Sequence, residues 1–260
     1  MSRDSVGHTL IVATVLCIAC SLLVSAASVG LHPRQVMNKE RDRQKTILEL
    51  TGLYQEDVPI EEAVKAIETR VVNLDTGEYV PEDQIDPQKF DQRRAAGDPA
   101  KSIAIPVAED VTGIGRREND SIVYLVNQDG KLDQIVLPIR GKGLWSTMYG
   151  YLALDSDAET VRGITFYEHG ETPGLGGEIE NVQWQDSWVG KHVYDGNGDL
   201  SLKVIKGMVD MKRPDAEYRI DGISGATITA NGVTNMIHYW LGPQGFEKYL
   251  DRLRAEGVAQ

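Results

Sequence analysis

The sequence predicts an α+β fold: one N-terminal transmembrane helix, followed by a domain in which a mixed or antiparallel sheet is flanked by helices. Three observations support this prediction. Residues 9–29 form an apolar run without any charged side chain. Beyond it, short alternating runs are separated by turn residues, which is typical of hairpins. The helical patterns are separated from these runs, which favours α+β over a parallel doubly wound sheet.

The apolar run is about as long as a helix that crosses a bilayer once. We therefore assign residues 1–31 to a membrane anchor. The alternative is a cleaved signal peptide, because Val24-Ser25-Ala26 resembles a small-residue cleavage site, but the basic region that should precede it is poor. Both cysteines, Cys17 and Cys20, lie inside this run, so we expect no disulfide and no cysteine-based metal site in the rest of the chain.

Residues 32–100 are expected to form a helical and irregular linker with peripheral elaborations. A charged helix follows the anchor, and a proline suits the first turn of the next helix. The turn signal Asp75-Thr76-Gly77 separates two short apolar runs and indicates a hairpin. The expected elements are helices at 33–51, 59–69 and 87–96, and a hairpin that joins 71–74 to 79–80.

Residues 101–260 are expected to form the main domain. Its clearest signal is Asn127-Gln128-Asp129-Gly130 between two alternating runs, because Asp-Gly favours the tight turn of a hairpin. Strands are expected at 122–126, 132–137, 149–154, 161–167, 202–205 and 218–220. Helices are expected near 178, at 229–241 and from 243 onward.

The composition restricts the partners of the chain. Its net charge of −12 and its pI near 4.9 argue against nucleic acid. The five histidines show no metal-ligand spacing, so no metal site is expected. No Gly-x-Gly-x-x-Gly stands between a strand and a helix, so no independent site for NADH is expected. We assign no catalytic acid, base or nucleophile.

The stretch from Asp221 to Val233 concentrates small and hydroxyl residues. It offers hydroxyls at Ser224, Thr227 and Thr229 and then adopts helical apolar spacing. A loop of small residues that leads into a helix start presents free N–H groups and a positive dipole end, which suit a phosphate. The alternative from these residues alone is an ordinary turn followed by a capped helix.

Two other loops are rich in glycine. Gly141-Lys142-Gly143-Leu144-Trp145 suggests a loop that passes close to a flat group, although a glycine loop with a core tryptophan is an equal alternative. The loop from His169 to Gly177 combines one proline and four glycines with a carboxylate, a hydroxyl and a leucine. That mixture suits a flavin ring, which has an apolar face and hydrogen-bonding edges.

These motifs resemble those of the FMN-binding domain family of Nqr/Rnf-type membrane flavoproteins. The run Ser-Gly-Ala-Thr-x-Thr is similar to the family's attachment motif, and the resemblance implies that Thr229 carries FMN covalently through a phosphoester bond. Glu-Thr-Pro-Gly-Leu-Gly and Gly-x-Gly-Leu-Trp resemble two further family stretches. The implied FMN contacts are Ser224, Gly225, Ala226, Thr227, Leu144, Trp145, Glu171, Thr172, Gly174, Leu175 and Lys206. For Lys206, a solvated lysine is the equal alternative.

The resemblance covers nearly the whole chain and is greatest to the C subunits of Na+-translocating NADH:quinone reductases. It implies an electron relay from NADH to ubiquinone coupled to Na+ export, with other subunits of the complex as partners. A separate flavin transferase using FAD would attach the FMN. The alternatives are the equivalent G subunit of an Rnf complex and a membrane-anchored scaffold without a cofactor.

The side of the membrane is ambiguous. Basic residues are denser after the anchor than before it, and the positive-inside rule would therefore leave the domain in the cytoplasm. The resemblance implies an inner-membrane protein whose FMN domain is periplasmic, and we adopt that expectation because long domains translocate regardless of such a bias.

Overall fold

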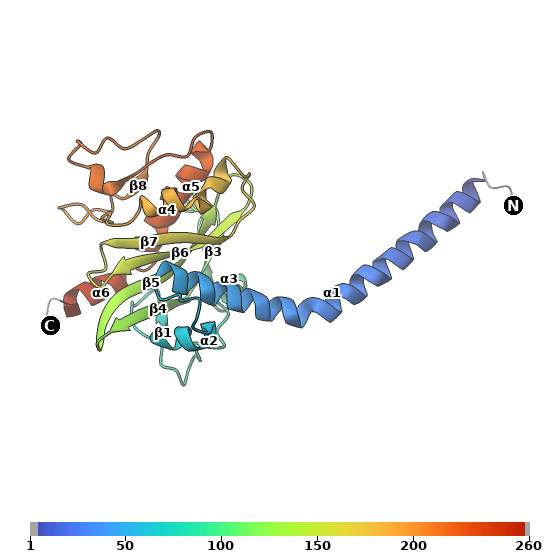
Figure 1. The fold of residues 1–260 in the computed structure, drawn as a ribbon, viewed down its shortest axis with the longest axis horizontal. Coiled ribbons are helices and arrows are strands. Elements are labelled where there is room, and N and C mark those ends of the chain that lie inside the picture. Colours follow the sequence, from blue (N-terminus) through green and yellow to red (C-terminus); the bar gives the residue numbers. More distant parts are fainter. Residues whose placement is uncertain (1–4, 258–260) are drawn as a thin grey trace. The chain divides into compact units, whose positions relative to one another are not determined.

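The computed structural model describes residues 5–257. The chain divides into two compact units, of which the first ends at Lys45 and the second begins at Thr46 (Figure 1). The second unit is built around an antiparallel sheet with helices, which confirms the predicted α+β class.

The N-terminal helix α1 runs from Val6 to Leu50. It is long and apolar enough to cross a membrane, as predicted. The charged helix expected at 33–51 is present through Leu50, but it continues the apolar helix through Pro33 instead of starting there. A proline inside a helix removes one backbone hydrogen bond and bends the helix without necessarily ending it.

The main sheet has five strands in the order β1-β4-β5-β6-β7, and every neighbouring pair is antiparallel. The strands are β1 (Ile67–Asn73), β4 (Asp120–Gln128), β5 (Lys131–Lys142), β6 (Thr147–Asp155) and β7 (Val161–Glu168). The predicted hairpin joins β4 to β5. Asp129 and Gly130 both have positive φ in its turn, at 52° and 79°, as a primed hairpin turn requires.

Two small sheets complete the strands. One pairs β2 (Ser102–Ala104) with β3 (Arg116–Glu118) in antiparallel orientation. The other pairs β8 (Lys203–Val204) with β9 (Arg219–Ile220) in parallel orientation. Because β8 and β9 are parallel, the segments that follow them leave at the same end of the pair.

The helices of the second unit differ from the predictions mainly at their ends. They are α2 (Ile60–Ala63), α3 (Gln92–Gly97), α4 (Val182–Asp186), α5 (Thr227–Leu241) and α6 (Glu247–Gly257), with short 3-10 turns at Val64–Ala66, Gly176–Glu180 and Ala216–Tyr218. The helix expected at 59–69 ends at Ala66 because Ile67 pairs with Val126 and starts β1. The last helix begins at Glu247 instead of Pro243.

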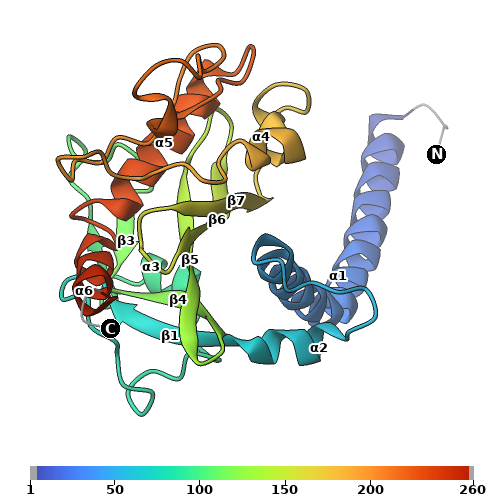
Figure 2. The same ribbon diagram turned by 60° about the vertical axis from the view of Figure 1, so that its left-hand side comes forward.

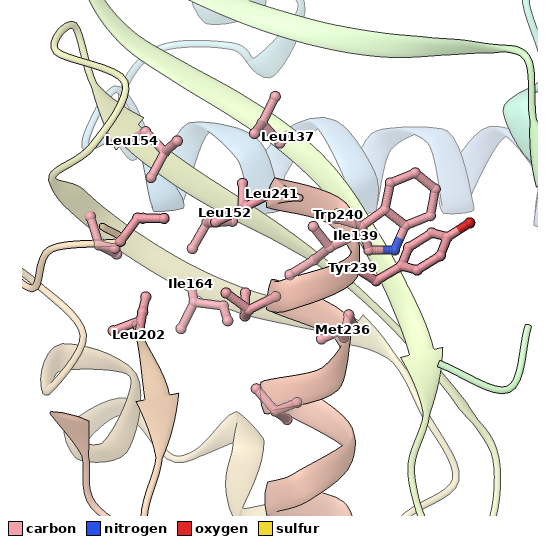
Figure 3. Close-up of a cluster of buried hydrophobic side chains, with 14 of the residues drawn as sticks. Leu137, Ile139, Leu152, Leu154, Ile164, Leu202, Met236, Tyr239, Trp240 and Leu241 are labelled. Atoms are coloured by element: carbon pink, nitrogen blue, oxygen red, sulfur yellow. The ribbon is translucent and has the colours of Figure 1, made fainter. Parts of the chain in front are cut away.

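Both faces of the main sheet are buried. One face packs against α5 and α6 (Figure 2), and Figure 3 shows Leu137, Ile139 and Leu152 beside Met236 and Trp240 of α5. Side chains that alternate with these on the strands form a second cluster with the end of α1 and with α2. The alternation follows from the two-residue period of a strand.

Helix α5 lies very close to β5. A Cβ atom added at Gly232 would lie 2.3 Å from the carbonyl oxygen of Lys142, so only glycine permits this approach. The Trp240 indole N–H donates to the carbonyl of Arg140 at 2.7 Å. These contacts hold α5 along the C-terminal end of β5.

Candidate functional site

The parallel pair β8–β9 positions the small-residue stretch. Ile205 N–H donates to the carbonyl of Ile220 at 2.9 Å, and Gly222 N–H donates to that of Gly207 at 2.7 Å. The Asp221 carboxylate accepts the N–H of Val209 at 2.6 Å. The loop after β8 and the loop after β9 are therefore held against each other, directly before α5.

A hollow of about 390 Å³ opens where these loops meet the first turn of α5. Its lining combines a lysine, hydroxyl groups, an amide and glycine backbone. The lining residues are Ile205, Lys206, Gly207, Met208, Gly222, Ile223, Ser224, Gly225, Thr227, Ala230 and Asn231. The hollow thus contains four of the predicted contact residues: Lys206, Ser224, Gly225 and Thr227.

Thr229 lies on the other side of the first turn of α5. Successive helical residues are rotated by about 100°, so the side chains of Thr227 and Thr229 are about 200° apart. Thr227 is exposed and faces the hollow, whereas Thr229 is only 1% exposed. Thr229 is the third residue of the helix rather than its cap, because the N-cap is Ala226.

The Thr229 hydroxyl is bound by a carboxylate. Its Oγ1 donates to Oε2 of Glu171 at 2.6 Å. Oε2 also accepts the N–H of Leu144 at 3.1 Å, and Oε1 accepts those of Trp145 at 2.9 Å and Ser146 at 3.3 Å. Glu171 is 5% exposed and joins the loop after β5, the loop after β7 and α5 at one point.

Two glycines make room for this carboxylate. A Cβ atom at Gly143 would lie 2.5 Å from Oε1 of Glu171. A Cβ atom at Gly176 would lie 2.6 Å from Oγ1 of Thr229 and 2.7 Å from Oε2 of Glu171. The close packing requires glycine at both positions because any side chain would displace the pair.

The environment keeps Glu171 ionised. Burial by itself would raise the pKa of this carboxyl, but hydrogen bonds from the Thr229 hydroxyl and from three backbone N–H groups outweigh burial and hold the pKa below its usual value. The site therefore contains a fixed negative charge directly beside a hydroxyl.

Apolar side chains lie exposed around the same turn. Trp145 is 69% exposed, and Leu144 and Leu175 are about half exposed. A methyl carbon of Leu175 lies 2.9 Å from the position that a Cβ of Gly225 would take, and Gly225 has φ of 71°. Trp145 is thus a surface residue, so the alternative of a core tryptophan is wrong.

The structure brings most of the predicted contact residues to the first turn of α5, on two sides. Four of them line the hollow, and Leu144, Trp145 and Thr229 lie on the Glu171 side. The side chain of Leu175 lies next to Gly225. Ala226 is the buried N-cap between the two sides, whereas Thr172 and Gly174 are exposed in the loop after β7.

The sequence reasoning missed several residues of the site. Ser146 donates its N–H to Glu171, and its Oγ accepts the N–H of Gly170 at 2.6 Å. Asn231 and Met208 line the hollow. Asn231 follows Thr227 by one helical turn, so helical periodicity could have indicated it. The sequence carries no comparable signal for Met208.

The residues present fit an FMN group. Ala226 caps α5 without a side-chain hydrogen bond, so the N–H groups of the first turn are available to a phosphate. Lys206 supplies a positive charge at the hollow. The exposed Trp145, Leu144 and Leu175 offer an apolar surface for a planar ring.

Comparisons with known proteins agree with this interpretation. The FMN-binding domain family matches residues 143–242, which include both sides of the site. FMN is therefore the cofactor, as predicted, and covalent attachment of FMN is characteristic of the family.

Relatives and solved structures resemble almost the whole chain. The C subunit of the Na(+)-translocating NADH-quinone reductase of Pseudomonas aeruginosa is 48% identical over 97% of this chain and 98% of its own. Its Yersinia pestis counterpart is 44% identical over 97% and 95%. The crystal structure of Shewanella oneidensis NqrC has a TM-score of 0.75 and is 36% identical over 84% of this chain and 99% of its own.

Both of these relatives are C subunits by name, which favours this assignment over the Rnf alternative. They are subunits of an oxidoreductase complex, and the long apolar α1 accords with a membrane-anchored protein. This chain belongs to the family of C subunits of the Na+-translocating NADH-quinone reductases.

Proposed function

We propose that this chain is the electron-transfer subunit that carries FMN on Thr229 and relays electrons from NADH toward ubiquinone in a Na+-exporting complex. When bound, FMN supplies reversible one-electron chemistry. The protein holds the flavin at a fixed place and tunes it through nearby hydrogen bonds and charges. Electrons arrive from NADH bound on another subunit, since we assign no NADH or quinone site to this chain.

The observation that carries this proposal is the arrangement around the first turn of α5. A hydroxyl, a helix start without a side-chain cap, a lysine and an exposed apolar surface converge there. A cofactor-free scaffold would give these groups no common purpose. The match to the FMN-binding domain family also supports a bound flavin.

The partners follow from this role. Other subunits of the reductase supply and accept the electrons, and a flavin transferase using FAD forms the ester. We also propose an inner-membrane location with the FMN domain in the periplasm. Covalent attachment suits that location because it prevents cofactor loss where no FMN pool exists.

The attachment is tested by peptide mass spectrometry of full-length protein that is made together with its transferase. We expect FMN on Thr229 in the wild type, no label in Thr229→Ala and a retained label in Thr227→Ala. Fluorescence of the denatured band under ultraviolet light gives an independent readout. A labelled Thr229→Ala protein would show that another hydroxyl is the acceptor, and an unlabelled wild type would reject the redox role.

Membrane orientation is tested in intact cells. A cysteine that replaces exposed Lys212 should react with a membrane-impermeant maleimide if the domain is periplasmic. The control is the unsubstituted chain, whose cysteines both lie in the apolar segment of α1. Protection of the new cysteine until the cells are lysed would instead place the domain in the cytoplasm.

A further inference from the structure

The two threonines in the first turn of α5, Thr227 and Thr229, differ in accessibility and in chemistry. Thr227 is exposed and lines the hollow, whereas Thr229 is buried and donates its hydroxyl hydrogen to Glu171. Accessibility alone would make Thr227 the acceptor of a flavin phosphate. If Thr229 is the acceptor, a chemical feature of its surroundings must compensate for its burial.

The Glu171 carboxylate is that feature, and its position does not depend on Thr229. Three backbone N–H groups from Leu144, Trp145 and Ser146 bind its two oxygens. Oε2 is thereby directed at Oγ1 of Thr229, 2.6 Å away. An activated hydroxyl generally has this arrangement: the nucleophile is hydrogen-bonded to a base, and other groups hold that base in position.

We propose that Glu171 is the general base for attachment of FMN and that it selects Thr229 over Thr227; this inference rests on the proposed function. Oγ1 of Thr229 forms a bond to the flavin-bearing phosphorus of FAD. The bond from that phosphorus to the bridging oxygen breaks, and AMP leaves with the bridging oxygen. The proton of Oγ1 passes to Oε2 of Glu171 and then to water, and no electrons are exchanged.

A weakly basic carboxylate suffices for this step. The hydrogen bonds that lower the pKa of Glu171 keep it ionised at neutral pH and ready to accept a proton. Phosphoryl transfer passes through a loose transition state, and in protein kinases an aspartate of the catalytic loop accepts the substrate hydroxyl proton. Position therefore matters more than basicity.

The same geometry requires one movement before the reaction. The backbone at Gly176 covers Oγ1 of Thr229, and Leu175 covers Gly225. The segment 172–177 must therefore shift to admit a flavin phosphate. Glu171 can stay in place during this shift, because the N–H groups that hold it belong to the loop after β5.

The test is the initial rate of FMN attachment to full-length protein by its transferase with FAD, read by in-gel fluorescence and by the mass of the Thr229 peptide. General-base catalysis contributes about 100-fold or more, so we expect at least a tenfold loss in Glu171→Gln, which cannot accept the proton. Glu171→Asp keeps a carboxylate and should be at least tenfold faster than Glu171→Gln. Glu178→Gln is a charge-matched change in the same region, at a carboxylate that accepts from the side chain of Asn181, and it should keep the wild-type rate.

A smaller loss in Glu171→Gln, or equal rates for Glu171→Asp and Glu171→Gln, would overturn the inference. If the wild type is labelled at Thr229 while Glu171→Gln matches it, only this inference fails. If the wild type is not labelled at Thr229, the proposed function itself fails.

If Glu171→Gln shows no cooperative thermal unfolding, and is therefore not folded, a second variant tests the inference. Gly176→Ala keeps the carboxylate but places a Cβ within 2.7 Å of both partner oxygens, which forces the pair apart. We expect attachment to slow at least tenfold. Gly196→Ala has nothing within 4 Å of the added Cβ and serves as the control. Attachment to Gly176→Ala at the wild-type rate would reject the role of the Glu171–Thr229 contact.

Discussion

Replacing Gly232 with alanine sets two opposing effects against each other in α5. In an exposed helix, glycine to alanine stabilises by about 1 kcal/mol because alanine loses less backbone entropy. At Gly232, however, the added Cβ would lie 2.3 Å from the carbonyl oxygen of Lys142 and 3.4 Å from the terminal methyl carbon of Met148. The first contact is about 1 Å too short, and it involves backbone in β5, which pairs along its length with β6.

The clash should dominate. Relief requires α5 to move away from β5, which would loosen the packing of Val233, Met236 and Trp240, all fully buried. Overpacking of this kind costs about 1–3 kcal/mol or more, and a rigid backbone neighbour favours the upper end of that range. After the helix-propensity gain is subtracted, we expect a net loss of about 2 kcal/mol. This corresponds to a melting temperature about 4–8 °C lower in a chain of this size.

The assay is thermal unfolding of the full-length protein in one detergent, followed by circular dichroism. Gly97→Ala, at the end of α3, adds a Cβ with nothing within 4 Å and should leave the melting temperature unchanged or slightly raised. Because the proposed acceptor Thr229 lies in the first turn of α5, Gly232→Ala should also slow FMN attachment. An unchanged or higher melting temperature for Gly232→Ala would refute the reasoning that close backbone contact requires glycine here.

Two further predictions concern buried carboxylates. Glu118 is fully buried and binds Arg140 at 2.5 Å, so Glu118→Gln should cost about 3–5 kcal/mol by leaving a buried guanidinium without its counter-charge. The control is Glu82→Gln, because Glu82 is exposed and pairs with Arg70, so this change should cost at most about 1 kcal/mol of stability. Equal melting temperatures for Glu118→Gln and Glu82→Gln would contradict this account. The pKa of Glu171 is lower in the folded chain than in the unfolded chain, which means that the fold stabilises the ionised carboxylate. This carboxylate therefore contributes stability at pH values above the unfolded-state pKa. The difference in melting temperature between wild type and Glu171→Gln should therefore be constant from pH 8 to about 5 and shrink as the pH falls below about 4.3, and a difference that widens in acid would contradict the sign.

Local signals in the sequence determined much of the fold. The turn at Asp129 and Gly130 was predictable because its positive φ angles depend on the residues of the turn itself. The apolar segment of α1 was predictable from composition. The prediction of a helix at 59–69 was wrong beyond Ala66. Residues 67–69 instead form β1, because pairing with β4 stabilises them more than continuing the helix would. Local periodicity carries no information about a partner strand whose Val126 pairs with Ile67 across 59 positions of the chain.

The sequence by itself indicated the stretches that the structure brings together: the small-residue stretch from Asp221 to Val233 and the two glycine-rich loops were visible as local composition. The anchor was visible in the same way. Only the tertiary structure decided how they meet. It placed Thr227 and Thr229 on opposite sides of α5 and paired Thr229 with Glu171, 58 positions earlier in the chain. A contact between such distant residues arises from packing of α5 on β5 through Gly232 and from the backbone donors after β5, neither of which a hydroxyl motif encodes.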